Sequence, residues 1–319
     1  MAQTTQLALT SDADLVACRD LLTQGSKSFA AASHLLPEEV RLAATALYAF
    51  ARDADDVVDL GPGGQSAVAG LRRRLDAIYG GAPGDLASDR ALCEVVHRFG
   101  IPRAAPQALL EGFAWDAEAR RYRDLDDMAA YCARVASTIG VMMCLVMRRR
   151  DRHTLARACD LGLALQTTNI CRDVGEDARA GRIYLPLDWL AEAGVSADGL
   201  LGQPTFSPAL GGVVARTLAA ADGWYRSADV GISRLPWRCR PAIRAARLIY
   251  ADIGRLIALN GHNSVDHRAY TGRSRKLWLL IAALPAVAWP RRESNAPTHP
   301  AAQFLVDACA AAPASTEVA

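Results

Sequence analysis

Hydrophobic residues recur along the chain at intervals of three and four positions, which is the period of an amphipathic helix. Segments in which apolar and polar residues alternate, as in strands, are nearly absent. Pro37 is followed by two glutamates, as at a helix start, and a glycine-proline cluster at residues 61–64 ends the same segment. We therefore predict an all-α fold with helices near residues 11–31, 37–60, 65–79, 88–99, 104–121, 126–149, 152–179, 209–234, 240–261 and 275–289.

The helical period continues without an internal repeat to about residue 290. Beyond that point the chain is rich in Ala, Pro, Ser and Thr and loses its period, which is typical of mobile termini. We therefore predict one helical domain over residues 1–290 and a mobile tail over residues 291–319. Because 51% of the 319 residues are hydrophobic, such a domain can bury a large core.

Charge and cysteine usage narrow the classes of function. The 36 basic and 34 acidic residues nearly cancel, so we expect no nucleic-acid partner. The eight cysteines include no C-x-x-C pair, and the six histidines show no ligand spacing. We expect buried, reduced thiols in a cytoplasmic protein without a zinc site. The N-terminus also lacks the basic start and apolar stretch of a secretory signal.

The longest uninterrupted apolar run, at residues 277–289, bears on membrane contact. Its thirteen residues include Pro285 and fall short of the roughly 20 needed to cross a bilayer, so we predict no transmembrane helix. Arg273, Arg275 and Lys276 precede the run. It is therefore either a helix that lies on a membrane surface or a buried core helix, and the sequence leaves both open.

The predicted helix at residues 37–60 carries the first candidate chemistry. At 3.6 residues per turn, Tyr48, Arg52, Asp55 and Asp59 share one side, which we call the first acidic face. Carboxylates one turn apart repel each other, yet the neighbouring alanines and valines are typical of a buried segment. The arrangement predicts a cation that compensates the two charges.

A second acidic face, formed by Gln166, Asn169, Asp173 and Asp177, is stacked in the same way on one side of the predicted helix at residues 152–179. Apolar leucines precede it, so these side chains also extend from an apolar helix. Amide and carboxylate oxygens, without a His or Cys alternative, are the ligands that Mg²⁺ prefers. This face therefore predicts a magnesium site that bridges to phosphate.

A single D-x-x-x-D pair on a helix is most often a solvated acidic surface. Here two such pairs lie in apolar helices, and each has an arginine beside it, Arg52 or Arg172, whose planar donors suit phosphate oxygens. The two helices are far enough apart in sequence to face each other across a bundle. We therefore predict two or three Mg²⁺ ions, with Mn²⁺ as a substitute, that hold a diphosphate between them.

Several motifs resemble those of the squalene and phytoene synthase family. They are SKSF at residues 26–29, the stretch at residues 46–59, residues 134–140, NICRDVGED at 169–177, GRIYLP at 181–186 and RKLW at 275–278. The resemblance covers residues 20–285. Within the family, the motifs are most similar to those of bacterial phytoene synthases of the purple photosynthetic type.

The resemblance implies a class I isoprenoid synthase fold, a helical bundle around a central cavity with both acidic faces at its mouth. It also implies that two geranylgeranyl diphosphates bind there and that loss of one diphosphate yields an allylic cation. Attack by the second substrate then gives a cyclopropylcarbinyl diphosphate. A second ionisation, rearrangement and proton loss give phytoene, so no NADPH is expected.

Roles for individual residues follow from the motifs. The expected metal ligands are Asp55, Asp59, Asn169, Asp173 and Asp177. The expected ligands of the substrate diphosphates are Ser26, Ser28, Arg52, Arg172, Arg268 and Lys276, with Gln166 beside them. Arg52 is also expected to be catalytic, together with four tyrosines that stabilise carbocations in a dry pocket: Tyr48, Tyr131, Tyr184 and Tyr250.

Two positions depart from the family pattern. Gly25 stands where relatives often have histidine, and Ser137 stands where many have glycine. Ala133, Ser137 and Gly140 are small residues of one predicted helix, and we expect them to line the tunnel for the prenyl chain. Ordinary helix packing uses the same residue types and is the alternative interpretation.

Two other functions stay open at this point. A presqualene diphosphate or dehydrosqualene synthase that uses farnesyl diphosphate would have the same fold and metals, and only the depth of the pocket would differ. A catalytically silent helical assembly protein would not need both acidic faces. For the enzyme, long apolar substrates predict peripheral contact with the inner face of the cell membrane, and neighbouring enzymes of carotenoid synthesis are expected contacts.

Overall fold

The computed structural model describes residues 10–60, 64–290, 292–294 and 296–311. Within these residues the chain is helical and has no strand, which confirms the all-α prediction. The α-helices are α1 (Asp12–Gly25), α2 (Lys27–Ser33), α3 (Glu38–Leu60), α4 (Gly64–Tyr79), α5 (Ala87–Phe99), α6 (Ala104–Ala117), α7 (Leu125–Cys132), α8 (Thr138–Val146), α9 (Arg152–Arg179), α10 (Leu187–Glu192), α11 (Ala197–Gly202), α12 (Pro208–Ile232), α13 (Arg240–Leu259), α14 (Arg273–Ala283) and α15 (Gln303–Ala311). A π turn, η1 (Ala133–Ser137), and two 3₁₀ turns, η2 (Leu284–Ala288) and η3 (Pro300–Ala302), complete the described elements.

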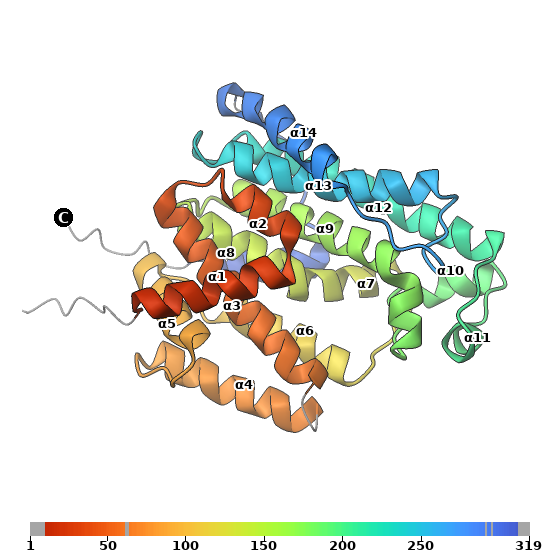
Figure 1. The fold of residues 1–319 in the computed structure, drawn as a ribbon, viewed down its shortest axis with the longest axis horizontal. Coiled ribbons are helices and arrows are strands. Elements are labelled where there is room, and N and C mark those ends of the chain that lie inside the picture. The colour runs from red at the N-terminus through yellow and green to blue at the C-terminus, as the bar shows by residue number, and fades with distance from the viewer. Residues whose placement is uncertain (1–9, 61–63, 291, 295, 312–319) are drawn as a thin grey trace, which may run out of the picture.

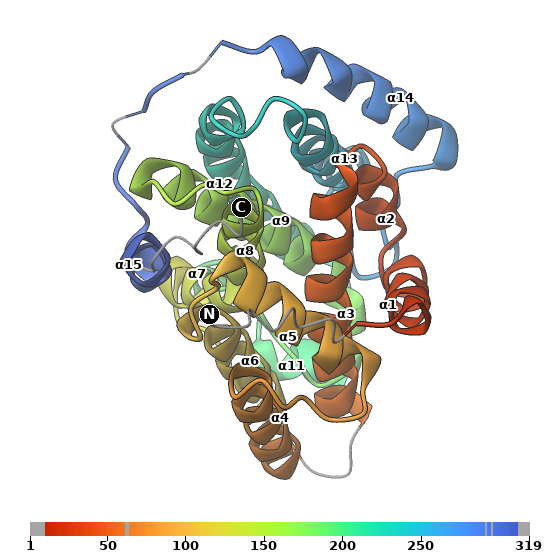
Figure 2. The same ribbon diagram turned by 90° about the vertical axis from the view of Figure 1, so that its left-hand side faces the viewer.

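Helices α3 and α9, which carry the two acidic faces, are central elements of the bundle. Helix α9 packs against α7, α8, α12, α13 and α15, and α3 packs against α1, α5, α6 and α8 (Figures 1 and 2). Helix α8 therefore contacts both of them. One hydrophobic core extends from Cys18 of α1 to Cys309 of α15, so the acidic side chains extend from the middle of a single packed body.

The predicted helix near residues 11–31 is two helices in the structure. Ser26 has an extended backbone, with φ −145° and ψ 95°, and separates α1 from α2. Its hydroxyl accepts a hydrogen bond from the Phe29 amide at 3.1 Å, which caps α2. The serine motif therefore lies at the N-terminus of a short helix, where sequence periodicity alone had placed it inside a long one.

The predicted helix near residues 126–149 also differs, because η1 interrupts it. Turns of the π type are rare and often lie at functional sites. The stretch Leu125–Val146 is long and apolar enough to cross a membrane by length and composition alone, but 67% of its apolar window is buried inside the protein. Arg134 and other polar residues interrupt this stretch, so it does not form an uninterrupted apolar run in the sequence.

The prediction of a mobile tail over residues 291–319 is wrong for residues 300–311. Helix α15 packs against α6, α8 and α9, and three of its side chains are fully buried in the core: Leu305, Val306 and Cys309. Alanines dominate this segment and concealed its short amphipathic helix. The last eight residues lie outside the part of the chain that the structure describes.

Candidate active site

The first acidic face lies on α3, as its spacing predicted. Arg52 Nη1 lies 3.2 Å from Asp55 Oδ2, and Arg52 also pairs with Asp56. Burial, followed by the charge of Asp59 one turn away, raises the pKa of Asp55 to about 6. One arginine therefore compensates the acidic cluster only in part.

The second acidic face lies on α9. Two arginines hold Asp173: Arg172 Nη2 is 2.5 Å from one carboxylate oxygen, and Arg268 Nε is 2.7 Å from the other. Burial, followed by the charge of Asp173, raises the pKa of Asp177 to about 8. Asn169 donates to Gln166 Oε1 at 3.3 Å, while its own buried oxygen finds no donor among the described residues.

The two acidic faces converge. Arg182, in the loop that follows α9, pairs with Asp59 of α3 at 2.7 Å. The charge of Asp116, on α6, contributes to the raised pKa values of both Asp55 and Asp177. One carboxylate thus lies within electrostatic reach of both pairs, so the acidic residues of α3 and α9 face a common region.

Asp116 is a candidate functional residue that the sequence reasoning missed. It accepts hydrogen bonds from the hydroxyls of Tyr131, at 3.0 Å, and Tyr184, at 2.6 Å. The two tyrosine rings stack with centroids 5.0 Å apart, and Tyr122 packs against both. Burial raises the pKa of Asp116 to about 6, although both hydroxyls oppose that shift. The available signal was a lone aspartate in an apolar helix, next to Trp115.

Tyr48 and Tyr250 form a second group of aromatic hydroxyls. The Tyr48 ring stacks on Phe29 at 5.5 Å, and burial, followed by the proximity of Tyr250, raises the pKa of Tyr48 to about 12. A β-carbon added to Gly25 would lie 2.4 Å from the Tyr48 hydroxyl oxygen. The glycine that departs from the family pattern therefore makes room for this tyrosine.

Besides Arg52 and Arg172 of the acidic faces, the residues predicted to bind diphosphate come from three further segments. Ser26 caps α2, Ser28 is half-buried at the second position of that helix, and Lys276 is half-buried near the start of α14. Burial, followed by the charge of Lys27, lowers the pKa of Lys276. The serine motif and the start of α14 therefore lie within electrostatic reach of each other. Arg268 joins the second acidic face directly, as described above.

The small residues predicted to line a prenyl tunnel make packing contacts. The Ser137 hydroxyl donates to the Cys159 carbonyl of α9 at 2.7 Å, and Ser137 is fully buried. A β-carbon on Gly140 of α8 would lie 2.7 Å from the carbonyl oxygen of Ala158, which is also on α9. Ala133 is also fully buried. These contacts favour the packing interpretation of Ser137 and Gly140 over the tunnel lining that we predicted.

Substitutions at these positions test that interpretation. We expect Ser137→Phe and Gly140→Phe to lower the melting temperature and to reduce turnover of C20 and C15 substrates by the same factor, because either ring would separate η1 or α8 from α9. Overpacking of this kind typically costs about 1–3 kcal/mol. The measurement is thermal unfolding together with initial rates on both substrates. A selective gain for the C15 substrate at unchanged stability would restore the tunnel interpretation.

Oxygen ligands that suit Mg²⁺ are concentrated here. Within the described residues no three acidic, histidine or cysteine side chains are arranged closely enough to enclose an ion by themselves. The available donors are nevertheless all hard oxygens, one of them the unsatisfied amide oxygen of Asn169. Burial, followed by a neighbouring carboxylate, raises the pKa values of Asp55 and Asp177, which indicates an excess of buried negative charge when these groups are ionised. The residues would therefore fit a metal ion whose coordination shell is completed by oxygens of the substrate.

This charge excess predicts how Asp177 affects stability. The pKa of Asp177, about 8 in the folded protein, lies above the ordinary aspartate value of 3.8, so its ionisation increasingly weakens the folded state as pH rises between those values. Asparagine cannot ionise. We therefore expect Asp177→Asn to raise the melting temperature in EDTA, and to do so more at pH 8 than at pH 5. Calorimetry checks this, with the exposed Asp222→Asn as the matched control. An equal effect at both pH values would contradict the shift.

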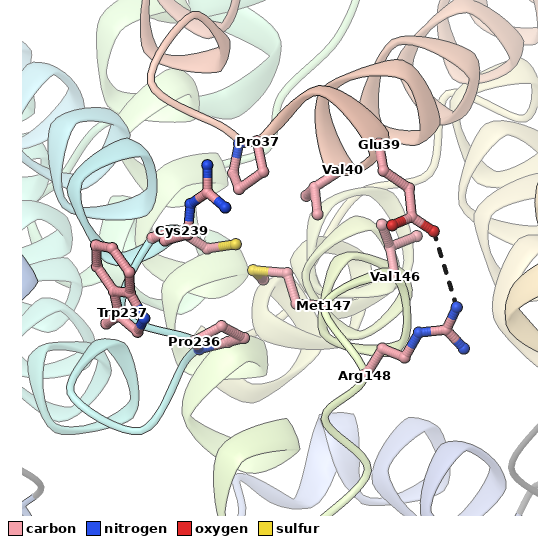
Figure 3. Close-up of a pocket in the computed structure, with 10 residues that line it drawn as sticks. Pro37, Glu39, Val40, Val146, Met147, Arg148, Pro236, Trp237 and Cys239 are labelled. Carbon is pink, nitrogen blue, oxygen red and sulfur yellow. Dashed lines mark ion pairs between the residues drawn. The ribbon is translucent and has the colours of Figure 1, made fainter. Parts of the chain in front are cut away.

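A pocket drawn in Figure 3 lies away from the two acidic faces. Its volume is about 190 Å³, and its walls come from the start of α3, the end of α8 and the segment before α13. Val40 in its wall is fifteen residues before Asp55 on α3, a distance of about 22 Å at 1.5 Å per residue. Met147 and Cys239 point toward each other across it, so the pocket is mainly apolar and separate from the candidate site.

Comparison with known proteins agrees with this geometry. The sequence profile described as squalene/phytoene synthase matches residues 22–275. The phytoene synthase of Cereibacter sphaeroides is 50% identical over 317 residues, which cover 95% of this chain and 89% of the relative. The phytoene synthase of Rhodobacter capsulatus is 48% identical, with 94% of this chain and 91% of the relative covered.

Solved structures show the same architecture. A dehydrosqualene synthase in complex with a ligand superposes with a TM-score of 0.79 at 28% identity, covering 85% of this chain and 95% of that one. A squalene synthase from Alicyclobacillus acidocaldarius superposes with a TM-score of 0.72 at 23% identity, which speaks for the fold alone; the superposition covers 79% of this chain and 95% of that one. Because the profile spans most of the chain and two relatives are about half identical to it, this chain belongs to the squalene/phytoene synthase family.

Proposed function

We propose that this chain is a prenyltransferase that condenses two molecules of geranylgeranyl diphosphate head to head into phytoene, through a cyclopropylcarbinyl (prephytoene) diphosphate. The observation that carries the proposal is the convergence of two carboxylate pairs, on α3 and α9, with Arg182 bound to Asp59 between them. Phytoene synthases that are about half identical support the choice of product. Two C20 diphosphates would lose two diphosphate ions and two protons, so the reaction needs no NADPH.

Asp55, Asp59, Asn169, Asp173 and Asp177 would hold Mg²⁺, or Mn²⁺ as a substitute. When bound, the metal supplies Lewis acidity toward the leaving diphosphate. The arginines beside these ligands now neutralise carboxylates, and they are positioned to bind phosphate oxygens instead. We propose Arg52, Arg172 and Arg268 for that role, with Gln166, Ser26, Ser28 and Lys276 as further ligands of the substrate.

The tyrosines would protect and stabilise the carbocation. Tyr131, Tyr184 and Tyr122 form a packed aromatic wall. Asp116 accepts hydrogen bonds from the hydroxyls of Tyr131 and Tyr184 and so fixes their orientation. An aromatic face stabilises a cation without adding a nucleophile that would trap it. Burial keeps the hydroxyl protons in place, because it raises the pKa of Tyr131 well above its usual value. Tyr48 and Tyr250 would line the same site.

Product identification tests the proposal. The purified protein is incubated with Mg²⁺ and either geranylgeranyl or farnesyl diphosphate, without NADPH, and the extracted products are identified by mass spectrometry. We expect phytoene from the C20 substrate and a much lower rate with the C15 substrate. Efficient conversion of farnesyl diphosphate to presqualene diphosphate or dehydrosqualene would assign the alternative product, and inactivity with both substrates would favour the silent assembly protein.

The same chemistry bears on where the protein works. Both substrate chains and the C40 product partition into apolar phases, so we place the enzyme in the cytoplasm against the inner face of the cell membrane. Contact with the neighbouring carotenoid-pathway enzymes that supply its substrate and consume its product is part of this proposal. Fractionation of cells into cytosol and membrane, with detection of the native chain, tests the location.

A further inference from the structure

Helix α14 and the η2 turn after it expose an unusual share of the apolar surface. Eleven large hydrophobic side chains are exposed in the described part of the chain, and five of them fall within residues 277–287. Leu277, Ile281 and Leu284 follow each other at steps of four and three, so they share one side of the helix. The five residues, which we call the α14 apolar face, are Leu277, Trp278, Ile281, Leu284 and Val287.

The opposite side of the same helix is packed. Leu279 and Ala283 are buried, and Ala283 forms a small core with Ala32 of α2 and Ala245 of α13. Both views place α14 at the outer edge of the fold, beyond α13 (Figures 1 and 2). The α14 apolar face therefore points away from the bundle, and no described part of the chain covers it.

Polar contacts fix α14 at both ends. Near its start, Arg275 Nη2 lies 3.1 Å from Asp252 Oδ1 of α13, and that carboxylate is almost completely buried. After η2, the carbonyl of Trp289 accepts a hydrogen bond from Arg240 Nη1 at 2.7 Å. A buried ion pair and a buried guanidinium thus hold α14 and η2 in place. The exposed apolar face therefore belongs to an ordered helix and is not a frayed end.

The surroundings of the face are positively charged. Between Asp266 and Glu293 the sequence has six basic residues and no acidic residue, and only two of the six, Arg268 and Arg275, form ion pairs with α9 or α13 among the described residues. Arg275 lies over the Trp278 ring, 4.6 Å from its centroid, and Arg273 is exposed at the helix start. Tryptophan and leucine on one side of a helix, with lysine and arginine next to them, are the composition of helices that lie in the interface of a bilayer.

We propose that the α14 apolar face docks on a lipid bilayer that contains anionic headgroups. The positive charge next to it favours such a bilayer over a second copy of this chain, which would bring like charge to the contact. The face also adjoins the candidate active site. Lys276 lies within electrostatic reach of Lys27 of the serine motif, and Arg268, five residues before α14, binds Asp173. A bilayer held here lies beside the site, where, on the proposed function, it would deliver prenyl chains.

Vesicle binding of the full-length protein, measured by flotation without substrate, tests this inference. Vesicles of phosphatidylcholine alone are compared with vesicles that also contain phosphatidylglycerol. Trp278→Ala is compared with Trp237→Ala, a matched control: Trp237 is 59% exposed, Trp278 is 55% exposed, and each has an arginine over its ring. We expect Trp278→Ala to bind anionic vesicles about tenfold more weakly than the wild type, and Trp237→Ala to bind as the wild type does.

A second pair of variants keeps the test decisive. The double variant Leu277→Ser/Ile281→Ser should bind anionic vesicles more weakly than Trp278→Ala does. Arg273→Glu should lower binding to anionic vesicles and leave binding to zwitterionic vesicles unchanged. Turnover in detergent should be retained by all of them, which separates this inference from the proposed function. Unchanged binding by Trp278→Ala, or an equal loss in Trp237→Ala, would overturn it. A wild-type dimer that Trp278→Ala dissociates would assign the face to self-association instead.

Discussion

Asp173→Asn should reduce turnover by about three orders of magnitude while leaving the fold intact, because a metal that stabilises a leaving diphosphate contributes several kcal/mol. Asp173 is held by Arg172 and Arg268 and belongs to the second acidic face, so one substitution removes a proposed metal ligand and the carboxylate partner of two arginines that we propose bind phosphate. Asp55→Asn should have an effect of similar size from α3. Initial rates at several Mg²⁺ concentrations measure both.

Asp222→Asn is the matched control for these variants, because Asp222 is an exposed aspartate of α12 and should keep wild-type activity. Circular dichroism and thermal unfolding establish that each variant is folded. We expect the loss in Asp173→Asn to persist at saturating Mg²⁺, since a missing ligand changes the reactive complex and not only its occupancy. A near-normal rate under those conditions would exclude a catalytic role for the carboxylate.

Asp116→Asn is expected to have the second largest effect, a loss of about a hundredfold in kcat. Asp116 acts through Tyr131 and Tyr184, whose hydroxyls it binds, and is therefore a positioning residue. An amide has a donor nitrogen where the carboxylate has its second acceptor oxygen, so one tyrosine hydroxyl can no longer donate to the atom that it now contacts. Removal of a single preorganised hydrogen bond at a reacting centre typically costs 10²–10³ in rate.

A double-mutant cycle distinguishes positioning by Asp116 from a merely structural role. If Asp116 acts by orienting the tyrosines, then Asp116→Asn combined with either Tyr131→Phe or Tyr184→Phe should be little worse than Asp116→Asn alone. Effects that simply multiply would indicate independent roles. Stability should change little, because asparagine also removes the cost of a buried carboxylate whose pKa is raised.

Hydrophobic periodicity predicted the all-α fold and most helix positions, and polar residues at steps of three and four predicted both acidic faces. Those features are local, since the residues that share a helix face are fixed by the helix itself. The break at Ser26 and the η1 turn were missed because each depends on a few backbone angles that apolar spacing does not report. Helix α15 was missed because tertiary burial of Leu305 and Val306 stabilises a segment with weak periodicity.

The candidate site shows the same division. Asp55, Asp59, Asp173 and Asp177 occur in pairs along the chain, and pairs can be recognised in a sequence. Asp116 is single, and its role depends on two tyrosines 15 and 68 residues away. Ser137 is a different case, because a small residue in an apolar helix suits a tunnel lining as well as helix packing, and its hydrogen bond to Cys159, which favours packing, cannot be read from the sequence.

The central claim is that the carboxylates of α3 and α9 share one metal–diphosphate site. Crystals of the wild-type protein grown with Mn²⁺ and a non-cleavable thiolodiphosphate analogue of geranylgeranyl diphosphate would test it by anomalous diffraction at the manganese edge. We predict manganese peaks within bonding distance of Asp55 or Asp59 on one helix and of Asn169, Asp173 or Asp177 on the other, bridged by the diphosphate. Manganese bound to only one of the two helices, with the diphosphate elsewhere, would contradict the claim.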